Sequence, residues 1–368
     1  MSSSRRDFLV RTGMTGVAAS LGMFSLRAFG QNPQTARLPT PAEAAVDPVL
    51  PPEATNGPWR NLRAVKDKKV VDIHTHIFES PVQGTTYHEE NLIHLKNEWL
   101  DFSNQLVESM DRYGVAVSVV SPIWASYEQN QKSDWLKHRG RLVMAVSPHV
   151  DPGAAGDIPG AGHSTSLTPE KAQFYADALR QQLTDGMHVN CTTEGGVPPG
   201  WKDPMELKPI MAVYKEFDVP VMIPVSWSQT RTAVGLHYET SEGPAERFAG
   251  LATSYPDIKF IMNHMGGRVE IPDGYEAIRC AMGLDNAWVE TSKSTAKMIT
   301  YAVQTLGPER VLFGSDWNRP QMKTYGPKNF HSIYQQWDAL NQVAGATISE
   351  DERDLILYKN ARRLIHLS

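Results

Sequence analysis

Short apolar segments alternate with helical patterns along most of this chain, and this alternation is the strongest constraint on its fold. Apolar runs typical of buried strands recur at 70–73, 116–120, 142–146, 186–189, 219–223, 259–262, 287–289 and 311–313. Helical patterns lie between most of them, at 99–113, 169–183, 205–217, 244–255, 275–282 and 296–306. Eight strands that alternate with helices predict an α/β fold, a (β/α)8 TIM barrel. The alternative, an open doubly wound sheet, would need a glycine-rich phosphate turn after an early strand, and the sequence has none there.

The first thirty residues indicate an export signal rather than a part of the fold. Arg5 and Arg6 form a twin-arginine motif ahead of a moderately apolar stretch at 12–26. That stretch is too short and too rich in glycine to span a bilayer comfortably, and the small residue Gly30 suits cleavage. We therefore expect residues 1–30 to be a removable signal that engages the twin-arginine export machinery. The protein would then be periplasmic or otherwise exported, and an uncleaved amino-terminal anchor is the alternative.

Two further parts follow the export signal. Residues 31–66 are rich in proline and alanine and poor in aliphatic periodicity, which predicts an extended, proline-rich linker that lies along the domain surface. A tether between a membrane and the enzyme is the alternative. Residues 67–368 remain for the folded domain, and this length suits a single α/β barrel.

Composition limits the partners and the covalent cross-links of the chain. The formal net charge is −5 and no basic stripe is present, so binding to nucleic acid is disfavoured. Cys191 and Cys280 could form one disulfide in an exported protein, or they could remain two buried thiols. The sequence allows a homo-oligomer without specifying one.

The stretch from Asp72 to His76 carries the clearest chemical signal. It continues an apolar run that begins at Val70, so His74 and His76 lie at the end of a predicted strand. Residues i and i+2 of a strand point to the same side, so both imidazoles project together. Imidazole suits zinc, iron, copper and nickel, which makes the pair half of a metal site. A His-x-His pair alone is weak evidence, because two histidines can be neighbours by chance.

Two later strands end in the same way as the first. His264 follows the apolar run at 259–262, and Asp316 follows the run at 311–313. Each residue alone could be a helix cap or a satisfied polar group of the core. In a TIM barrel, however, catalytic groups gather at the carboxyl ends of the strands. The first and eighth strands become neighbours when the barrel closes, so Asp316 is expected beside the histidine pair.

These motifs resemble the amidohydrolase-related branch of the amidohydrolase superfamily, which includes aminocarboxymuconate-semialdehyde decarboxylase and related hydrolases and lactonases. The resemblance is carried by residues 72–76, 263–267 and 313–317, and by the ending at 352–367. It implies a TIM barrel with His74, His76 and Asp316 as ligands of a divalent metal, for which zinc is the expectation. It also implies that His264 handles the nucleophilic water or the substrate.

One position departs from the family pattern. Members of this family usually carry a metal-binding histidine at the end of the fifth strand, where this chain has Pro224. Proline cannot ligate a metal, so the site has fewer ligands, a substitute ligand, or a weak or absent metal. His188, near the predicted end of the fourth strand, is a candidate substitute. It could equally be a pocket histidine that contacts substrate or a satisfied core histidine.

The expected function is metal-dependent hydrolysis of a small ester, lactone or amide by activated water. In that reaction Asp316 would accept a proton from water and His264 would stabilise the developing oxyanion. Two alternatives remain open. One is a metal-dependent, non-oxidative decarboxylase of an aromatic or unsaturated carboxylate, in which His264 or Asp316 protonates the carbon that loses carbon dioxide. The other is a non-catalytic exported protein that binds a small molecule.

The export signal generates the first prediction. Changing both Arg5 and Arg6 to lysine should leave the precursor in the cytoplasm, because the twin-arginine route depends on the paired arginines. The measurement is the fraction of protein recovered from the periplasm. An unchanged periplasmic yield in the double variant would reject twin-arginine export.

Overall fold

A computed structural model describes residues 52–79, 100–121, 133–148, 167–192, 195–198, 201–225, 245–266, 272–317 and 335–367. The chain separates into two compact units, Met1–Ala36 and Arg37–Ser368, and all described residues belong to the second unit. The predicted export signal and the first part of the predicted linker therefore lie outside the described residues. Within the described part, no helix has the length and apolar character needed to cross a membrane.

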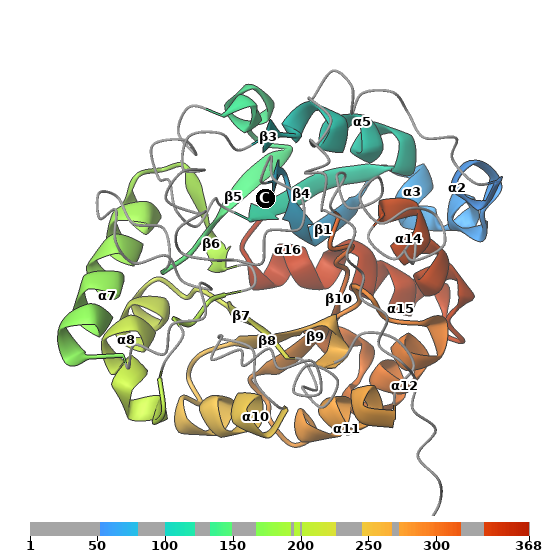
Figure 1. The fold of residues 1–368 in the computed structure, drawn as a ribbon. Helices are drawn as coiled ribbons and strands as arrows, with labels where there is room; N and C mark the ends of the chain where they lie inside the picture. The colour runs from blue at the N-terminus through green and yellow to red at the C-terminus, as the bar shows by residue number, and fades with distance from the viewer. Residues whose placement is uncertain are drawn as a thin grey trace, which may run out of the picture. The chain divides into compact units, whose positions relative to one another are not determined.

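Eight parallel strands form two four-stranded sheets (Figure 1). The first sheet contains β1 (Val70–His76), β4 (Val115–Ser121), β5 (Leu142–Val146) and β6 (His188–Thr192) in that order. The second contains β7 (Val221–Pro224), β8 (Phe260–Asn263), β9 (Ala287–Glu290) and β10 (Val311–Leu312), again with sequential neighbours paired. All eight predicted strands are thus confirmed, with shifts of a few residues at their ends.

The two sheets close into a barrel at two seams. At the first seam the backbone N–H of Asp316 donates to the carbonyl of His74 at 2.8 Å, and that of His76 donates to Trp317 at 2.9 Å. These bonds join β1 to the segment that follows β10. The first and eighth strands are therefore adjacent, as predicted.

The second seam joins β6 to β7. The backbone N–H of Thr192 donates to the carbonyl of Pro220 at 3.1 Å, and the Thr192 hydroxyl accepts the N–H of Met222 at 2.6 Å. With both seams bonded, the architecture is the predicted (β/α)8 barrel.

Helices connect and surround the strands (Figure 1). The longer ones are α5 (Ser103–Tyr113), α7 (Pro169–Thr184), α8 (Lys208–Glu216), α10 (Ala245–Ser254), α11 (Pro272–Cys280), α12 (Ala296–Leu306) and α14 (Gln336–Gly345). Short elements are β2 (Phe78–Glu79), β3 (Leu100–Asp101), and single 3₁₀ turns at Asp134–His138, Pro204–Leu207, His264–Gly266 and Pro308–Arg310. The chain ends in α15 (Glu350–Asp354), a π-helical turn (Leu355–Lys359) and α16 (Asn360–Leu364).

Apolar side chains fill both sides of the strands. An inner cluster lines the barrel axis and includes Val71, Val119, Met222 and Ile261, while a larger cluster packs between the strands and the helices. Because both faces are buried, the strands are almost continuously apolar in sequence. Cys191 belongs to the inner cluster, and burial raises its pKa to about 12. Both cysteines are free thiols, so the disulfide alternative is not realised.

A bulge in β1 sets the direction of the histidine pair. Asp72 pairs with Ser118 of β4, whereas Thr75 pairs with Val120, so three steps along β1 match two along β4. An extra residue of this kind redirects the side chains that follow it. The bulge explains why Asp72 reaches outward to the amide of Gln336 in α14, while His74 lies at the barrel mouth.

Residues 52–66 differ from the extended linker that the sequence predicts. They form α2 (Pro52–Asn56), a 3₁₀ turn (Pro58–Asn61) and α3 (Arg63–Lys66). Trp59 is 4% exposed, lies edge-on to Tyr113 at 5.1 Å between ring centroids, and donates its backbone N–H to the Asn341 side chain. The last fifteen residues of the expected linker therefore lie on the surface of the barrel, but as helical turns rather than as an extended chain, because Trp59 gives them an apolar anchor.

The docking of residues 52–66 predicts a stability effect. Trp59→Ala should lower the free energy of unfolding by about 3–5 kcal/mol, because a large buried side chain is removed. Phe174→Ala is the matched control, since Phe174 is 43% exposed and should cost less than about 1 kcal/mol. Chemical denaturation of both variants is the measurement. Equal midpoints for the two would show that the segment adds nothing to the barrel.

Candidate metal centre

His74, His76 and Asp316 converge at the carboxyl ends of β1 and β10. The Nε2 atoms of the two histidines lie 3.1 Å apart, and Asp316 Oδ1 lies 3.5 Å from His74 Nε2 and 3.0 Å from His76 Nε2. His74 and Asp316 are buried and His76 is half-buried. Separations of this size allow all three atoms to contact one cation at ordinary zinc–ligand distances. The donor set therefore fits the divalent metal that the sequence predicts.

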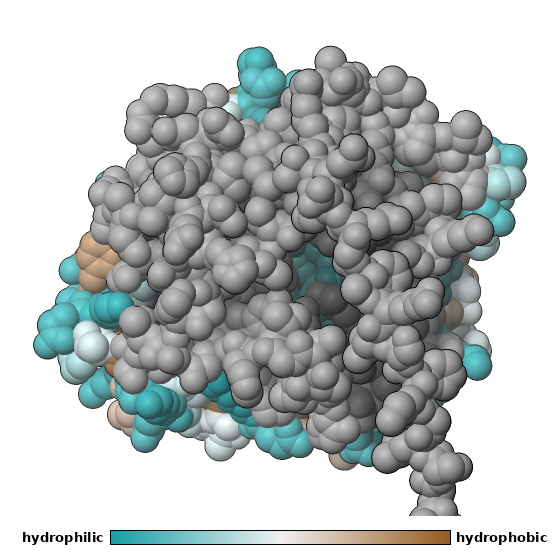
Figure 2. All heavy atoms as spheres, in the orientation of Figure 1, coloured by the Kyte–Doolittle hydropathy of each residue, from teal (hydrophilic) through white to brown (hydrophobic). Residues whose placement is uncertain are grey.

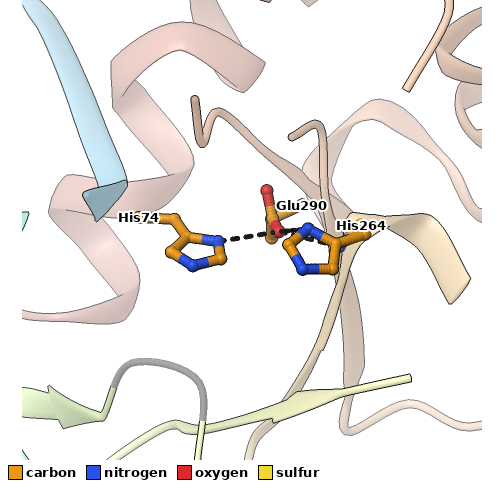
Figure 3. A group of neighbouring side chains, drawn as sticks. All are labelled: His74, His264 and Glu290. Atoms are coloured by element: carbon orange, nitrogen blue, oxygen red, sulfur yellow. Dashed lines mark hydrogen bonds and ion pairs between the residues drawn. The ribbon is translucent and has the colours of Figure 1, made fainter. Parts of the chain in front are cut away.

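Glu290, at the end of β9, orients His74 (Figure 3). Its Oε1 lies 3.2 Å from His74 Nδ1 and accepts the backbone N–H of His264 at 2.7 Å. Ser292 donates its backbone N–H and its hydroxyl to the same carboxylate, both at 2.6 Å. A carboxylate that only accepts requires the hydrogen of His74 on Nδ1, which leaves Nε2 with a lone pair for a metal. This is the usual way in which a second carboxylate supports a metal-binding histidine.

The same bonds decide between two groups of potential ligands. Among the described residues, His74 can be grouped with His76 and Asp316, or with His264 and Glu290. The Glu290 oxygens are already engaged by hydrogen bonds from Ser292, His264 and His74. Glu290 therefore supports the first group rather than forming a second metal site.

His264 lies next to His74, and its hydrogen bonds determine which of its two ring nitrogens carries the hydrogen. The two rings stack at 5.2 Å between centroids, with an interplanar angle of 26°. His264 Nδ1 lies 2.6 Å from the Ser292 hydroxyl, and that hydroxyl donates to Glu290. Nδ1 must therefore be the donor to Ser292. His264 Nε2 then accepts a hydrogen bond from Lys293 Nζ at 3.2 Å.

Lys293 is the residue of the site that the sequence analysis missed. Its ammonium contacts Asp316 Oδ2 as well as His264 Nε2, and its side chain is almost fully buried. The available signal was the sequence Glu290-Thr291-Ser292-Lys293, in which polar residues directly follow an apolar strand, as in the other motifs.

Opposing effects act on Asp316. Burial alone would raise its pKa, but the charge of Lys293 together with His74 and His76 holds the pKa well below its ordinary value. Asp316 is therefore a carboxylate near neutral pH. An ionised carboxylate is the form that binds a metal.

Asp72 holds the backbone next to Asp316 through hydrogen bonds. It accepts hydrogen bonds from the backbone N–H of Ser315 at 3.0 Å, from the Ser315 hydroxyl at 2.6 Å and from Gln336 at 3.0 Å. Burial raises the pKa of Asp72 to about 6, although the bonds from Ser315 and Gln336 oppose the rise. Because Ser315 precedes Asp316, Asp72 fixes the backbone that carries a candidate ligand.

His188 is not placed to complete the metal centre. The prediction that it lies near the end of its strand is wrong, because β6 begins at His188. Its ring bonds to Asp185, with Nδ1 2.9 Å from the carboxylate, in the turn before the strand. It therefore lies at the amino end of the barrel, whereas His74 and Asp316 lie at carboxyl ends. Pro224 ends β7 beside Asn263 and offers no side-chain donor atom.

Two further residues that follow barrel strands in the sequence contribute less to the described site. Trp317 is buried in the core, and Arg247 stacks on Trp201 at 3.7 Å. Five further polar or aromatic residues, which the sequence places near strand ends or in the loop after the fifth strand, lie outside the described residues: Trp124, His149, Trp227, His237 and Tyr238.

The family model described as Amidohydrolase matches residues 71–367, which include every residue of the site. This chain belongs to the amidohydrolase family. Family membership confirms the expectation that the protein is an enzyme, and it confirms the resemblance seen in the sequence motifs.

Individual relatives of this amidohydrolase are distant. An uncharacterized protein of Sinorhizobium fredii is 27% identical over 132 residues, which cover 32% of this chain and 41% of that protein. This chain thus matches less than half the length of that relative. Gamma-resorcylate decarboxylase of Rhodococcus jostii is 22% identical over 330 residues, which cover 78% of this chain and 92% of that enzyme.

Solved structures share the fold. Dihydroxybenzoic acid decarboxylase of Polaromonas, with bound manganese and 2-nitroresorcinol, is 18% identical with a TM-score of 0.50 and covers 81% of this chain and 97% of its own. 5-Carboxyvanillate decarboxylase of Sphingomonas paucimobilis is 14% identical with a TM-score of 0.51 and covers 82% and 99%. At these identities the likeness establishes the barrel and no finer property.

The support that Glu290 gives to His74 generates a prediction. Glu290→Gln should weaken binding of a divalent metal by about 10–100-fold, because an amide no longer accepts equally from Ser292, His264 and His74. The measurement is metal affinity by chelator competition. Glu309→Gln, a change at an exposed glutamate, is the control and should bind metal like the wild type. Equal affinity of both variants would contradict the supporting role of Glu290.

Proposed function

We propose that this protein is a divalent-metal-dependent decarboxylase that releases carbon dioxide from an aromatic or unsaturated carboxylic acid. The sequence alone favoured hydrolysis of an ester, lactone or amide, with decarboxylation as an alternative. The comparisons support the alternative better, because the relative that is aligned over most of its length is a decarboxylase. We also propose, from Arg5 and Arg6, that the enzyme is exported.

The observation that carries the proposal is the position of Lys293 between Asp316 and His264. Hydrolysis needs a base that takes a proton from water, and the carboxylate of Asp316, which would have to be that base, is already paired with the Lys293 ammonium. Decarboxylation instead needs a proton for the carbon atom that loses its carboxylate. The ammonium of Lys293, which donates to His264 Nε2, is a proton carrier next to the candidate metal ligands.

The residues of the site can be assigned to the steps of this reaction. His74, His76 and Asp316 would hold the metal, which when bound supplies positive charge to orient the substrate carboxylate and an adjacent oxygen. The electron pair of the breaking carbon–carbon bond stays on the substrate carbon, which takes a proton by way of His264 and Lys293. Manganese and zinc both suit a set of two imidazoles and one carboxylate.

An activity assay tests the proposal. The purified protein, loaded with Mn²⁺ or Zn²⁺, should release carbon dioxide from 2,6-dihydroxybenzoate, 5-carboxyvanillate or a related hydroxybenzoate. In deuterated water the product should carry deuterium at the carbon that lost the carboxylate. His74→Ala should lose both metal and activity. His366→Ala, a change at an exposed histidine paired with Asp218, is the matched control and should retain both.

Other outcomes distinguish the remaining functions. Turnover of lactones, esters or amides without release of carbon dioxide would establish the hydrolase instead. Full activity after exhaustive chelation would contradict the metal requirement. Binding of these acids without turnover of any substrate class would point to the non-catalytic binding protein.

A further inference from the structure

The candidate metal centre combines a missing ligand with an additional cation. Pro224 ends β7, the strand where the family resemblance leads one to expect a metal-binding histidine, and its side chain has no donor atom. Lys293, three residues after the end of β9, instead brings an ammonium group to Asp316. The site therefore lacks a side-chain donor at the end of β7 and has a positive charge beside Asp316.

The two oxygens of Asp316 have different partners. Oδ1 faces His76 Nε2 at 3.0 Å and His74 Nε2 at 3.5 Å, and it completes the set of three metal donors. Oδ2 contacts the Lys293 ammonium. The carboxylate can thus give one oxygen to a metal while the other remains paired with Lys293.

Burial makes this pairing important for the protein without metal. The side chains of Asp316 and Lys293 are each 6% exposed. A buried carboxylate that loses a compensating charge is strongly destabilising. The positive charge of Lys293 also repels any cation bound to Oδ1, and this repulsion is poorly screened in a buried site.

A hydrogen bond to His264 also holds the Lys293 ammonium in place. Its Nζ donates to His264 Nε2 at 3.2 Å, and His264 is itself held through Ser292 to Glu290. The ammonium therefore cannot turn away from Asp316 without breaking a bond to a positioned partner.

We propose that Lys293 is a positioning residue that acts as an internal substitute for the metal charge. It compensates Asp316 when no metal is bound, keeps the carboxylate monodentate, and lowers the affinity of the site for divalent cations. The protein without metal consequently keeps an ordered site, and its metal is readily exchanged. This inference concerns metal binding and does not depend on which reaction the enzyme catalyses.

The test measures metal affinity and thermal stability of the full-length chain without substrate. Lys293→Met should bind Zn²⁺ or Mn²⁺ at least about tenfold more tightly than the wild type in chelator competition, because the repulsion is removed. Saturating metal should also raise its melting temperature by about 5 °C more than it raises that of the wild type. Lys293→Arg keeps the charge and should resemble the wild type. Lys297→Met is the matched control, an equal charge change at an exposed lysine on α12.

A second pair of variants keeps the inference testable if Lys293→Met folds poorly. In the absence of metal, the double variant Lys293→Met with Asp316→Asn should melt at a higher temperature than Lys293→Met alone, since no unpaired buried charge remains. A double variant no more stable than Lys293→Met would overturn charge compensation. Weaker metal binding by both Lys293→Met and Lys293→Arg would overturn the inference too, because it would make the neutral amine of Lys293 a metal ligand.

Discussion

The candidate site depends on how one buried carboxylate is held. Glu290 has no exposed surface, and leaving a buried carboxylate without partners would be costly. Its oxygens accept hydrogen bonds from Ser292, from the backbone of His264 and from the ring of His74. These bonds offset the cost of burial, and they also join the ends of β1, β8 and β9. The hydrogen bonds that stabilise buried Glu290 are therefore the ones that orient His74 and His264.

The backbone conformation after the strand ends also positions the side chains of the site. His264, Lys293 and Asp316 have φ values of 56°, 55° and 53°, in the left-handed region that residues other than glycine adopt at some cost. Each follows a strand end and leaves the extended conformation abruptly, so its side chain can turn over the barrel mouth. Gly314 is required for space instead: a Cβ atom there would clash with Glu290 Oε2 and lie 3.0 Å from His74 Cβ. Three of the left-handed residues thus carry functional groups of the site, whereas others, such as Lys68 and Asp218, lie before strands.

The fold was largely predictable because strand and helix periodicities are local properties. The runs at 142–146 and 296–306 appear in the structure as β5 and α12 with unchanged bounds. Residues 52–66 were expected to be extended, because proline content was visible whereas the pocket that receives Trp59 was not. His188 was assigned to the wrong end of its strand, since the start of β6 depends on its pairing with Met144 of β5 rather than on its own residues.

Some features of the candidate site also follow from the sequence, and others depend on tertiary structure. The sequence alone determined that His74 and His76 share one side of a strand, and that Asp316 lies beside them if the barrel closes, because both follow from period and strand order. It did not determine that Glu290 supports His74 or that Lys293 contacts Asp316. Those contacts join residues of different strands through left-handed turns and a bulge in β1. Only the closed barrel decides them, because only closure brings separate strand ends within hydrogen-bonding distance.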